Sequence, residues 1–157
     1  MSYGPHERQN RVVHPTMKAS TMPEAPVIIS LPIADRPSSF AFYRDGLGLE
    51  PLGEPAEDGV PEPLQFELNE GLHMMLVPEG GFGWTIGDHE VASTGTSECV
   101  LSIAVDDEAE VGKLIERAVH AGAAVVTPPG QQPWGYVGTF ADPDGHLWMV
   151  RCASGQS

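Results

Sequence analysis

The chain has 157 residues, of which 41% are hydrophobic, and its formal net charge is −14. This length suits one domain with a hydrophobic core and is too short for two domains of ordinary size. No apolar run approaches the roughly 20 residues of a membrane span or has the form of a signal peptide, so we expect a cytoplasmic protein without a membrane partner.

The acidic residues are concentrated in one part of the sequence. Residues 1–26 carry two Glu against three Lys or Arg, a net of +1, which leaves −15 for residues 27–157. Such a surface repels nucleic acid, because phosphate binding needs clustered Lys and Arg. It would attract cations, although solubility alone would also explain it.

The two cysteines, Cys99 and Cys152, form no CxxC motif and no cluster of zinc-binding spacing. Without a signal peptide, reduced buried thiols are expected.

Residues 1–26 show no apolar period and contain four prolines. They are predicted to form a flexible N-terminal arm, ahead of a single domain at residues 27–153.

The first module is predicted at residues 27–78 and begins with a β-branched strand at 27–33. A helix should follow at 36–47, with Asp35 as its N-cap and Pro37 in its first turn. The apolar face of this helix should contain Phe40, Tyr43 and Leu47, widened by Phe42. Alternating apolar residues predict three further strands, at residues 49–52, 64–68 and 72–77.

The linker at residues 79–97 is long and Gly-rich, and it contains two aromatic residues, Phe82 and Trp84. Long segments of this kind are usually functional or mobile. The linker could be a flap over a cleft, or a plain connection whose aromatic side chains cover a sheet.

The second module, at residues 98–153, repeats the plan of the first. Val111, Leu114 and Ile115 share one face of a predicted helix at 107–121. Strands are predicted at residues 99–105, 123–127, 134–140 and 146–151. The fold class is therefore α+β, with two βαβββ modules whose curved mixed sheets flank a cleft.

An internal duplication supports this plan. Placing Ser30 on Ser102 also places Asp35 on Asp107, and the last strands align with Met75 on Met149. Duplication predicts two stacked modules, since each alone leaves one sheet face uncovered.

Two segments stand out, AFYRDGLGLE at residues 41–50 and GTFADPDGHLWMV at 138–150. With the duplicated topology, they resemble the glyoxalase/bleomycin-resistance/extradiol-dioxygenase superfamily, also called the vicinal oxygen chelate (VOC) superfamily. SLPIAD, MMLVPEGGF and WGYVGTFADPDGHLW further resemble small bacterial proteins described as predicted lactoylglutathione lyases.

The resemblance implies positions for a divalent metal, on the first and last strands of each module. Carried over, these positions are Ile28, Met75, Val100 and Met149. None offers the imidazole or carboxylate donors that such an ion needs. No metal or other cofactor is therefore expected. His73, with Glu67 beside it, is the main alternative route to a metal site.

Strand alternation places a set of side chains on the faces that should line the cleft. The predicted ligand-binding residues are Ser30, His73, Met75, Phe82, Trp84, Ser102, Trp134, Tyr136, Met149 and Arg151. An apolar hollow with a few polar groups is typical of small-molecule sites. Alternatively, Trp134, Tyr136 and Met149 fill the space and leave an inert core.

These features favour a metal-free protein that binds a small molecule and sequesters a cationic or aromatic ligand. The alternative is a metal-dependent lyase or isomerase of the lactoylglutathione lyase type, so the sequence leaves open whether any reaction is catalysed. Edge strands and apolar surface at the module junction predict a homodimer.

Overall fold

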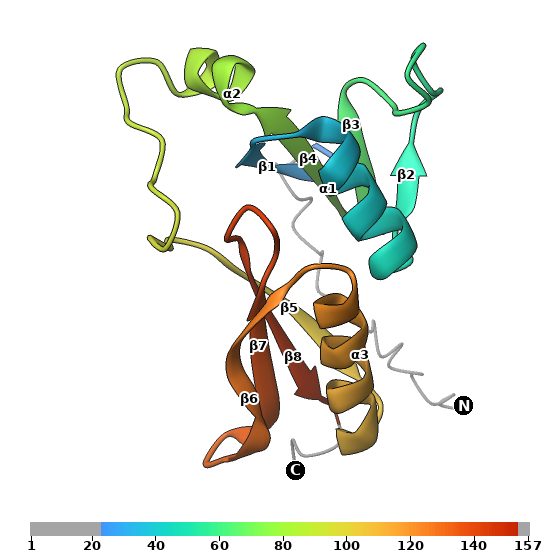
Figure 1. Ribbon diagram of the computed structural model, residues 1–157, viewed down its shortest axis with the longest axis vertical. Helices are drawn as coiled ribbons and strands as arrows, with labels where there is room; N and C mark the ends of the chain where they lie inside the picture. Colours follow the sequence, from blue (N-terminus) through green and yellow to red (C-terminus); the bar gives the residue numbers. More distant parts are fainter. Residues whose placement is uncertain (1–22, 154–157) are drawn as a thin grey trace, which may run out of the picture.

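The computed structural model describes residues 23–153, so most of the expected N-terminal arm lies outside the described residues (Figure 1). Residues 23–26 belong to no helix or strand. In chain order the elements are β1 (Val27–Ile33), α1 (Arg36–Ala41), the π-helix η1 (Phe42–Gly46), β2 (Glu50–Leu52), β3 (Leu64–Asn69), β4 (Leu72–Pro78), α2 (Glu79–Ile86), β5 (Val100–Val105), α3 (Glu108–His120), β6 (Ala124–Gln132), β7 (Gly135–Ala141) and β8 (Leu147–Cys152). No helix in residues 23–153 is long and apolar enough to cross a membrane.

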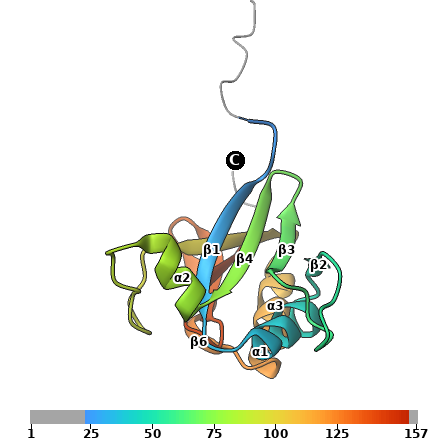
Figure 2. The same ribbon diagram turned by 90° about the horizontal axis from the view of Figure 1, so that it is seen from above.

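Each module forms a four-stranded mixed sheet, in the order β1-β4-β3-β2 and β5-β8-β7-β6. Figure 2 shows the strands of the first sheet side by side. The first strand of each module runs parallel to the last, and the other pairs are antiparallel. Ser30 lies opposite Met75, and Ser102 lies opposite Met149. This equivalent register confirms the prediction of two βαβββ modules.

The predicted N-cap at Asp35 is confirmed, and the structure shows that Asp107, its counterpart in the second module, caps α3 in the same way. The Asp35 carboxylate accepts a hydrogen bond from the Ser38 backbone N–H at 2.9 Å, and Asp107 accepts one from Glu110 at the same distance. Each bond satisfies an N–H group that the first helical turn would otherwise leave free.

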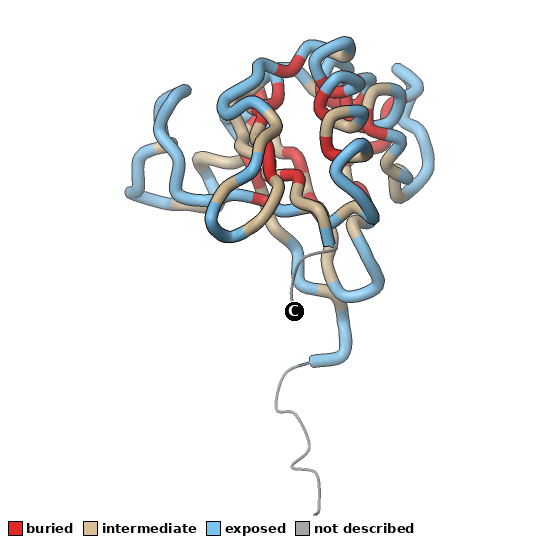
Figure 3. The backbone as a smooth tube through the Cα atoms, turned by 90° about the horizontal axis from the view of Figure 1, so that it is seen from below, coloured by how far each residue is buried: buried red, intermediate tan, exposed pale blue. Residues whose placement is uncertain are grey.

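A single hydrophobic core spans the two modules. From the helices, Phe40, Tyr43 and Leu47 are buried, as are Val111 and Ile115, while Leu114 is partly buried. The predicted helix faces are therefore correct. Figure 3 shows the buried segments gathered in the interior, with the linker exposed along the side.

The first helical segment packs against the second module as well as against its own sheet. Gly46, at the end of η1, lies so close to α3 that an added Cβ would overlap the Cβ of Ala121. Arg117 in α3 donates a hydrogen bond to the Leu47 carbonyl at 3.2 Å. The helices α1 and α3 lie on the same side of the molecule (Figure 1).

Three local predictions need correction. The segment expected at 79–97 as a loop contains α2, whose three glycines hid its helical form. The first predicted helix changes to a π-helix at Phe42, which buries Phe42 together with Tyr43. The second strand of the second module is longer than residues 123–127 and extends through Gln132.

Candidate functional site

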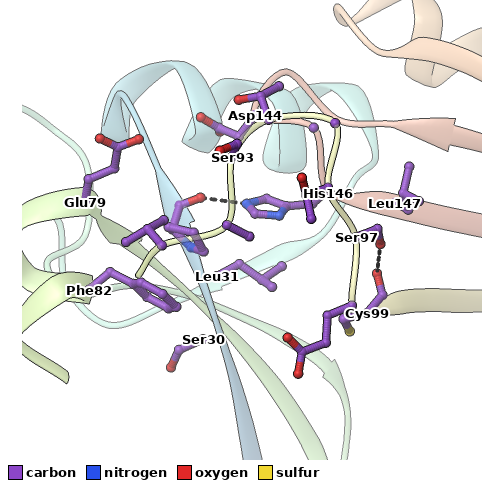
Figure 4. Close-up of a pocket in the computed structure, with 18 of the residues that line it drawn as sticks. Ser30, Leu31, Glu79, Phe82, Ser93, Ser97, Cys99, Asp144, His146 and Leu147 are labelled. Carbon is purple, nitrogen blue, oxygen red and sulfur yellow. Dashed lines mark hydrogen bonds between the residues drawn. The ribbon is translucent and has the colours of Figure 1, made fainter. Parts of the chain in front are cut away.

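A cavity of 820 Å³ lies between the two modules, under the segment that joins them (Figure 4). Its lining comes from β1, from α2 and residues 87–99, from the first half of β5, and from the turn at 143–147 that leads into β8. The cavity therefore occupies the space between the edge strands of the two sheets, since β1 and β5 each end their sheet.

The inner wall of the cavity is apolar. Leu31 of β1 and Leu101 of β5 are buried side chains at the border of the core, and Leu147 of β8, which is partly buried, also lines the cavity. Phe82 and Ile86 approach from α2, and Figure 4 shows the Phe82 ring near Leu31. These five side chains can bury the hydrophobic body of a ligand.

The turn that borders the cavity is fixed by its own hydrogen bonds. Asp142 Oδ1 accepts from the backbone N–H of Asp144 at 2.9 Å and of His146 at 2.8 Å. Gly145 has a φ of +94°, which a residue with a side chain rarely adopts. This DPDG sequence therefore forms the rigid turn that its residue types predict.

The same turn joins the two modules. Asp144 accepts hydrogen bonds from the Ala34 backbone N–H at 2.9 Å and from Ser39 Oγ at 3.1 Å. His146 Nε2 lies 2.6 Å from the Pro32 carbonyl oxygen, the contact drawn in Figure 4. The position of the turn relative to β1 is thus set by three polar contacts.

Behind the turn lies a buried polar cluster. The Tyr43 hydroxyl donates to Asp142 Oδ2 and accepts from Trp148 Nε1, the latter at 3.1 Å. Burial raises the pKa of Asp142, against the lowering effect of the Tyr43 hydrogen bond. Burial also raises the pKa of Tyr43 well above its ordinary value, and the nearby Asp142 charge adds to this. The tyrosine therefore remains neutral and able to donate.

The charged residues that line the cavity are acidic. Glu79 and Glu90 border it from the linker and Glu98 from the residue directly after it, and these three are called the linker carboxylates below; Asp144 borders the cavity from the turn. Among the described residues, no Lys or Arg contributes to the lining. The electrostatic potential of such a cavity favours positively charged ligands over anions.

Apolar side chains occupy the four positions at which the family resemblance implies metal ligands. Ile28, Met75, Val100 and Met149 lie on β1, β4, β5 and β8, and none carries a donor for a hard divalent ion. His73 lies opposite Glu67 across β4 and β3. Within residues 23–153, however, no group of three or more His, Cys, Asp or Glu side chains is placed to hold a metal ion. The donors present do not fit a catalytic metal site.

The predicted site residues are not all brought together. Ser30 and Phe82 line the cavity, whereas Tyr136 packs against the core. Trp84 is 85% exposed on α2, and Trp134 is 71% exposed at the β6–β7 turn. The others alternate with core residues and so lie on the open sheet faces: His73, Met75, Ser102, Met149 and Arg151.

Sequence analysis missed several lining residues. His89, His146 and the linker carboxylates border the cavity, as does Cys99, which is exposed rather than buried as expected. Both cysteines are free, as expected. Four acidic residues dispersed over positions 79–98 were the available signal, whereas strand alternation indicated the sheet faces.

Comparisons with known proteins agree with this architecture. Residues 26–150 match the family described as the Glyoxalase/Bleomycin resistance protein/Dioxygenase superfamily. An uncharacterised protein of Mycobacterium bovis is 33% identical over 127 residues, which cover 76% of this chain and 78% of that protein.

Two solved structures have a similar fold. A glyoxalase-related enzyme from Fulvimarina pelagi has a TM-score of 0.67 and 31% identity, over 80% of this chain and 85% of that chain. TnmS3, an antibiotic binding protein from Streptomyces sp. CB03234, has a TM-score of 0.59 and 22% identity, over 87% of this chain and 100% of that chain.

Proposed function

Since the chain belongs to the Glyoxalase/Bleomycin resistance protein/Dioxygenase superfamily, we propose that it binds and sequesters an organic small molecule without the help of a metal ion. The ligand is cationic or aromatic, and it occupies the cavity between the modules. The observation that carries this proposal is the cavity itself, which combines 820 Å³ of space, an apolar wall and carboxylates at its border.

Two further observations support a binding function over a metal-dependent one. The four positions that would hold a metal carry only aliphatic or thioether side chains, and these cannot supply the charge that polarises a substrate oxygen. In addition, TnmS3, which has a similar fold, is described as an antibiotic binding protein. Such a fold can therefore serve binding rather than chemistry.

The test is a titration of the purified protein with cationic and neutral aromatic compounds, followed by tryptophan fluorescence in the presence of EDTA. We expect saturable binding that EDTA does not change, and no formation of lactoylglutathione from methylglyoxal and glutathione with added zinc, nickel or manganese. Stoichiometric metal in the protein as purified, or such turnover, would support the alternative of a metal-dependent lyase and overturn the proposal.

The double variant Met149→Glu, Val100→His sharpens this test. It introduces two donors at positions that the family uses for metal ligands. Metal binding by the double variant alone would show that the strands keep a suitable geometry while the natural side chains do not.

We further propose that the protein is a homodimer. The edge strands β1 and β5 present free backbone groups, and Val27, Ile28 and Val100 along them are 55%, 46% and 50% exposed. A second copy could cover both the backbone groups and the apolar surface. Sedimentation at micromolar concentration should give twice the 16.8 kDa of the chain, and a purely monomeric species would contradict the proposal.

A further inference from the structure

We infer that the linker gives the cavity a selectivity for organic cations, with Glu79, Glu90 and Glu98 as the residues that hold the positive charge. The apolar wall beneath them contacts the hydrophobic body of the same molecule. This inference rests on the proposed function, because it names the ligand class of that cavity and the residues that select it.

The three linker carboxylates are available to a ligand. Within residues 23–153, none of them has a hydrogen-bonding or ion-pairing partner. Asp144, in contrast, has both carboxylate oxygens occupied by Ala34 and Ser39. A ligand cation could therefore pair with the linker glutamates without breaking an existing contact, while Asp144 adds negative charge from a fixed position.

No described cationic side chain competes for these carboxylates. Arg36, Arg44 and Lys113 are paired with Asp58, Asp45 and Glu110, and Arg117 donates to a backbone carbonyl. None of these, nor Arg151 on β8, lines the cavity. An anionic ligand would meet four carboxylates and no positive partner, so its binding would be disfavoured.

The hydrophobic part of the ligand has a defined location. Leu31 and Leu101 form the inner wall, and Phe82 and Ile86 of α2, neither of which is fully buried, line the cavity with them. A ligand that contacts these side chains would cover apolar surface of β1, β5 and α2. The cavity volume of 820 Å³ falls in the range of about 300–1,000 Å³ that drug-sized ligands occupy.

The linker can adjust to a ligand because it is weakly held. Helix α2 contains Gly80, Gly81 and Gly83 and has no buried residue. Glycine lowers helix stability, and a helix without buried side chains gains little from packing. Trp84 lies two residues after Phe82 on the same helix and is 85% exposed, so its emission should report a rearrangement of the linker.

Tetraphenylphosphonium (cationic) and tetraphenylborate (anionic) have nearly the same size and shape and so isolate the effect of charge. Triphenylphosphine oxide, which has one phenyl group fewer, serves as a neutral aromatic compound. Each is titrated into the Trp134→Phe protein, which removes one exposed tryptophan and leaves Trp84 and the buried Trp148. We expect tetraphenylphosphonium to bind most tightly and tetraphenylborate most weakly. The preference should shrink as salt rises from 0.1 M to 1 M, because the Debye length falls from about 10 Å to about 3 Å.

Matched variants locate the selectivity. Glu79→Gln, Glu90→Gln removes two carboxylates at the cavity, and Glu54→Gln, Glu57→Gln removes two exposed carboxylates that do not line it. The first pair should weaken tetraphenylphosphonium binding about fivefold to tenfold and leave triphenylphosphine oxide within about twofold, as expected for exposed ion pairs. The control pair should leave both within about twofold.

The outcomes separate this inference from the proposed function. Equal binding of the three compounds, or equal losses in the two variant pairs, would overturn the selectivity of the linker while leaving a small-molecule binder. Failure of all three compounds and of the wider aromatic panel would overturn the proposed function itself.

Discussion

Tyr43 joins the two modules through a buried polar cluster. It is 1% exposed, its ring lies 5.9 Å from that of Trp148, and its hydroxyl contacts both Asp142 and Trp148. The Tyr43→Phe variant would keep the ring and leave the buried Trp148 N–H without its acceptor. An unpaired buried polar group costs about 1–3 kcal/mol, so we expect a loss of that size in the free energy of unfolding measured in urea.

Tyr136→Phe is the matched control for this substitution. Tyr136 is partly buried, and its hydroxyl has no hydrogen-bonding partner among the described residues. Its removal should change stability by less than about 0.5 kcal/mol. Equal losses in the two variants would mean that the buried cluster contributes nothing specific.

Asp142 makes the stability of the fold depend on pH. Burial raises its pKa in the folded state, whereas the unfolded chain should keep a value of about 3.9. Between these two values the folded state binds the proton more tightly, so the contribution of Asp142 is largest at low pH and falls as pH rises through the folded pKa.

This dependence can be isolated with Asp142→Asn, which does not titrate. The measurement is the free energy of unfolding of both proteins from about pH 4 to about pH 8. The stability of the parent protein relative to the variant should fall as pH rises, and then become constant. A relative stability that rises with pH would show that the hydrogen bonds to Asp142 outweigh its burial.

At the scale of elements, η1 approaches α3 closely. Gly46 is required there, because a methyl group would overlap Ala121. Gly46→Ala should lower the free energy of unfolding by about 1–3 kcal/mol, the usual cost of overpacking. Gly112→Ala is the control, since it lies within α3 and an added Cβ meets nothing within 4 Å. That change should be neutral or stabilising by up to about 1 kcal/mol; a loss there as large as at Gly46 would exclude the proposed contact.

Some of these helices and strands could be predicted from the sequence, and others could not. The cap at Asp35 and the alternation in β3 depend on residues near in sequence, so their patterns were sufficient. Helix α2 lacks such a pattern, because its glycines weaken propensity and no residue in it is buried. The location of the cavity could not be predicted either, because it depends on contacts between residues far apart in the sequence. It depends on how far β1 lies from β5, a distance set by the packing of η1 against α3 and by the turn at Asp144.

At the scale of the whole molecule, the two modules share one core. Phe66 of the first module contacts Tyr43, whose ring lies against Trp148 of the second. Neither module could unfold without exposing part of the core of the other. We expect one thermal transition in which the calorimetric and van't Hoff enthalpies agree. Two resolved transitions would show that the modules are independently stable.

The exposed linker is a place where the chain could be cut without loss of the fold. Residues 87–99 have no helix or strand, and nearly all of them are exposed, so a protease could cut there without touching the core. The polar contacts of Asp144 and the ring contacts of Tyr43 would still hold the halves together. The gene could then be divided at this segment, and the two products, neither of which covers its own apolar face, should reassemble by fragment complementation and elute together from a sizing column.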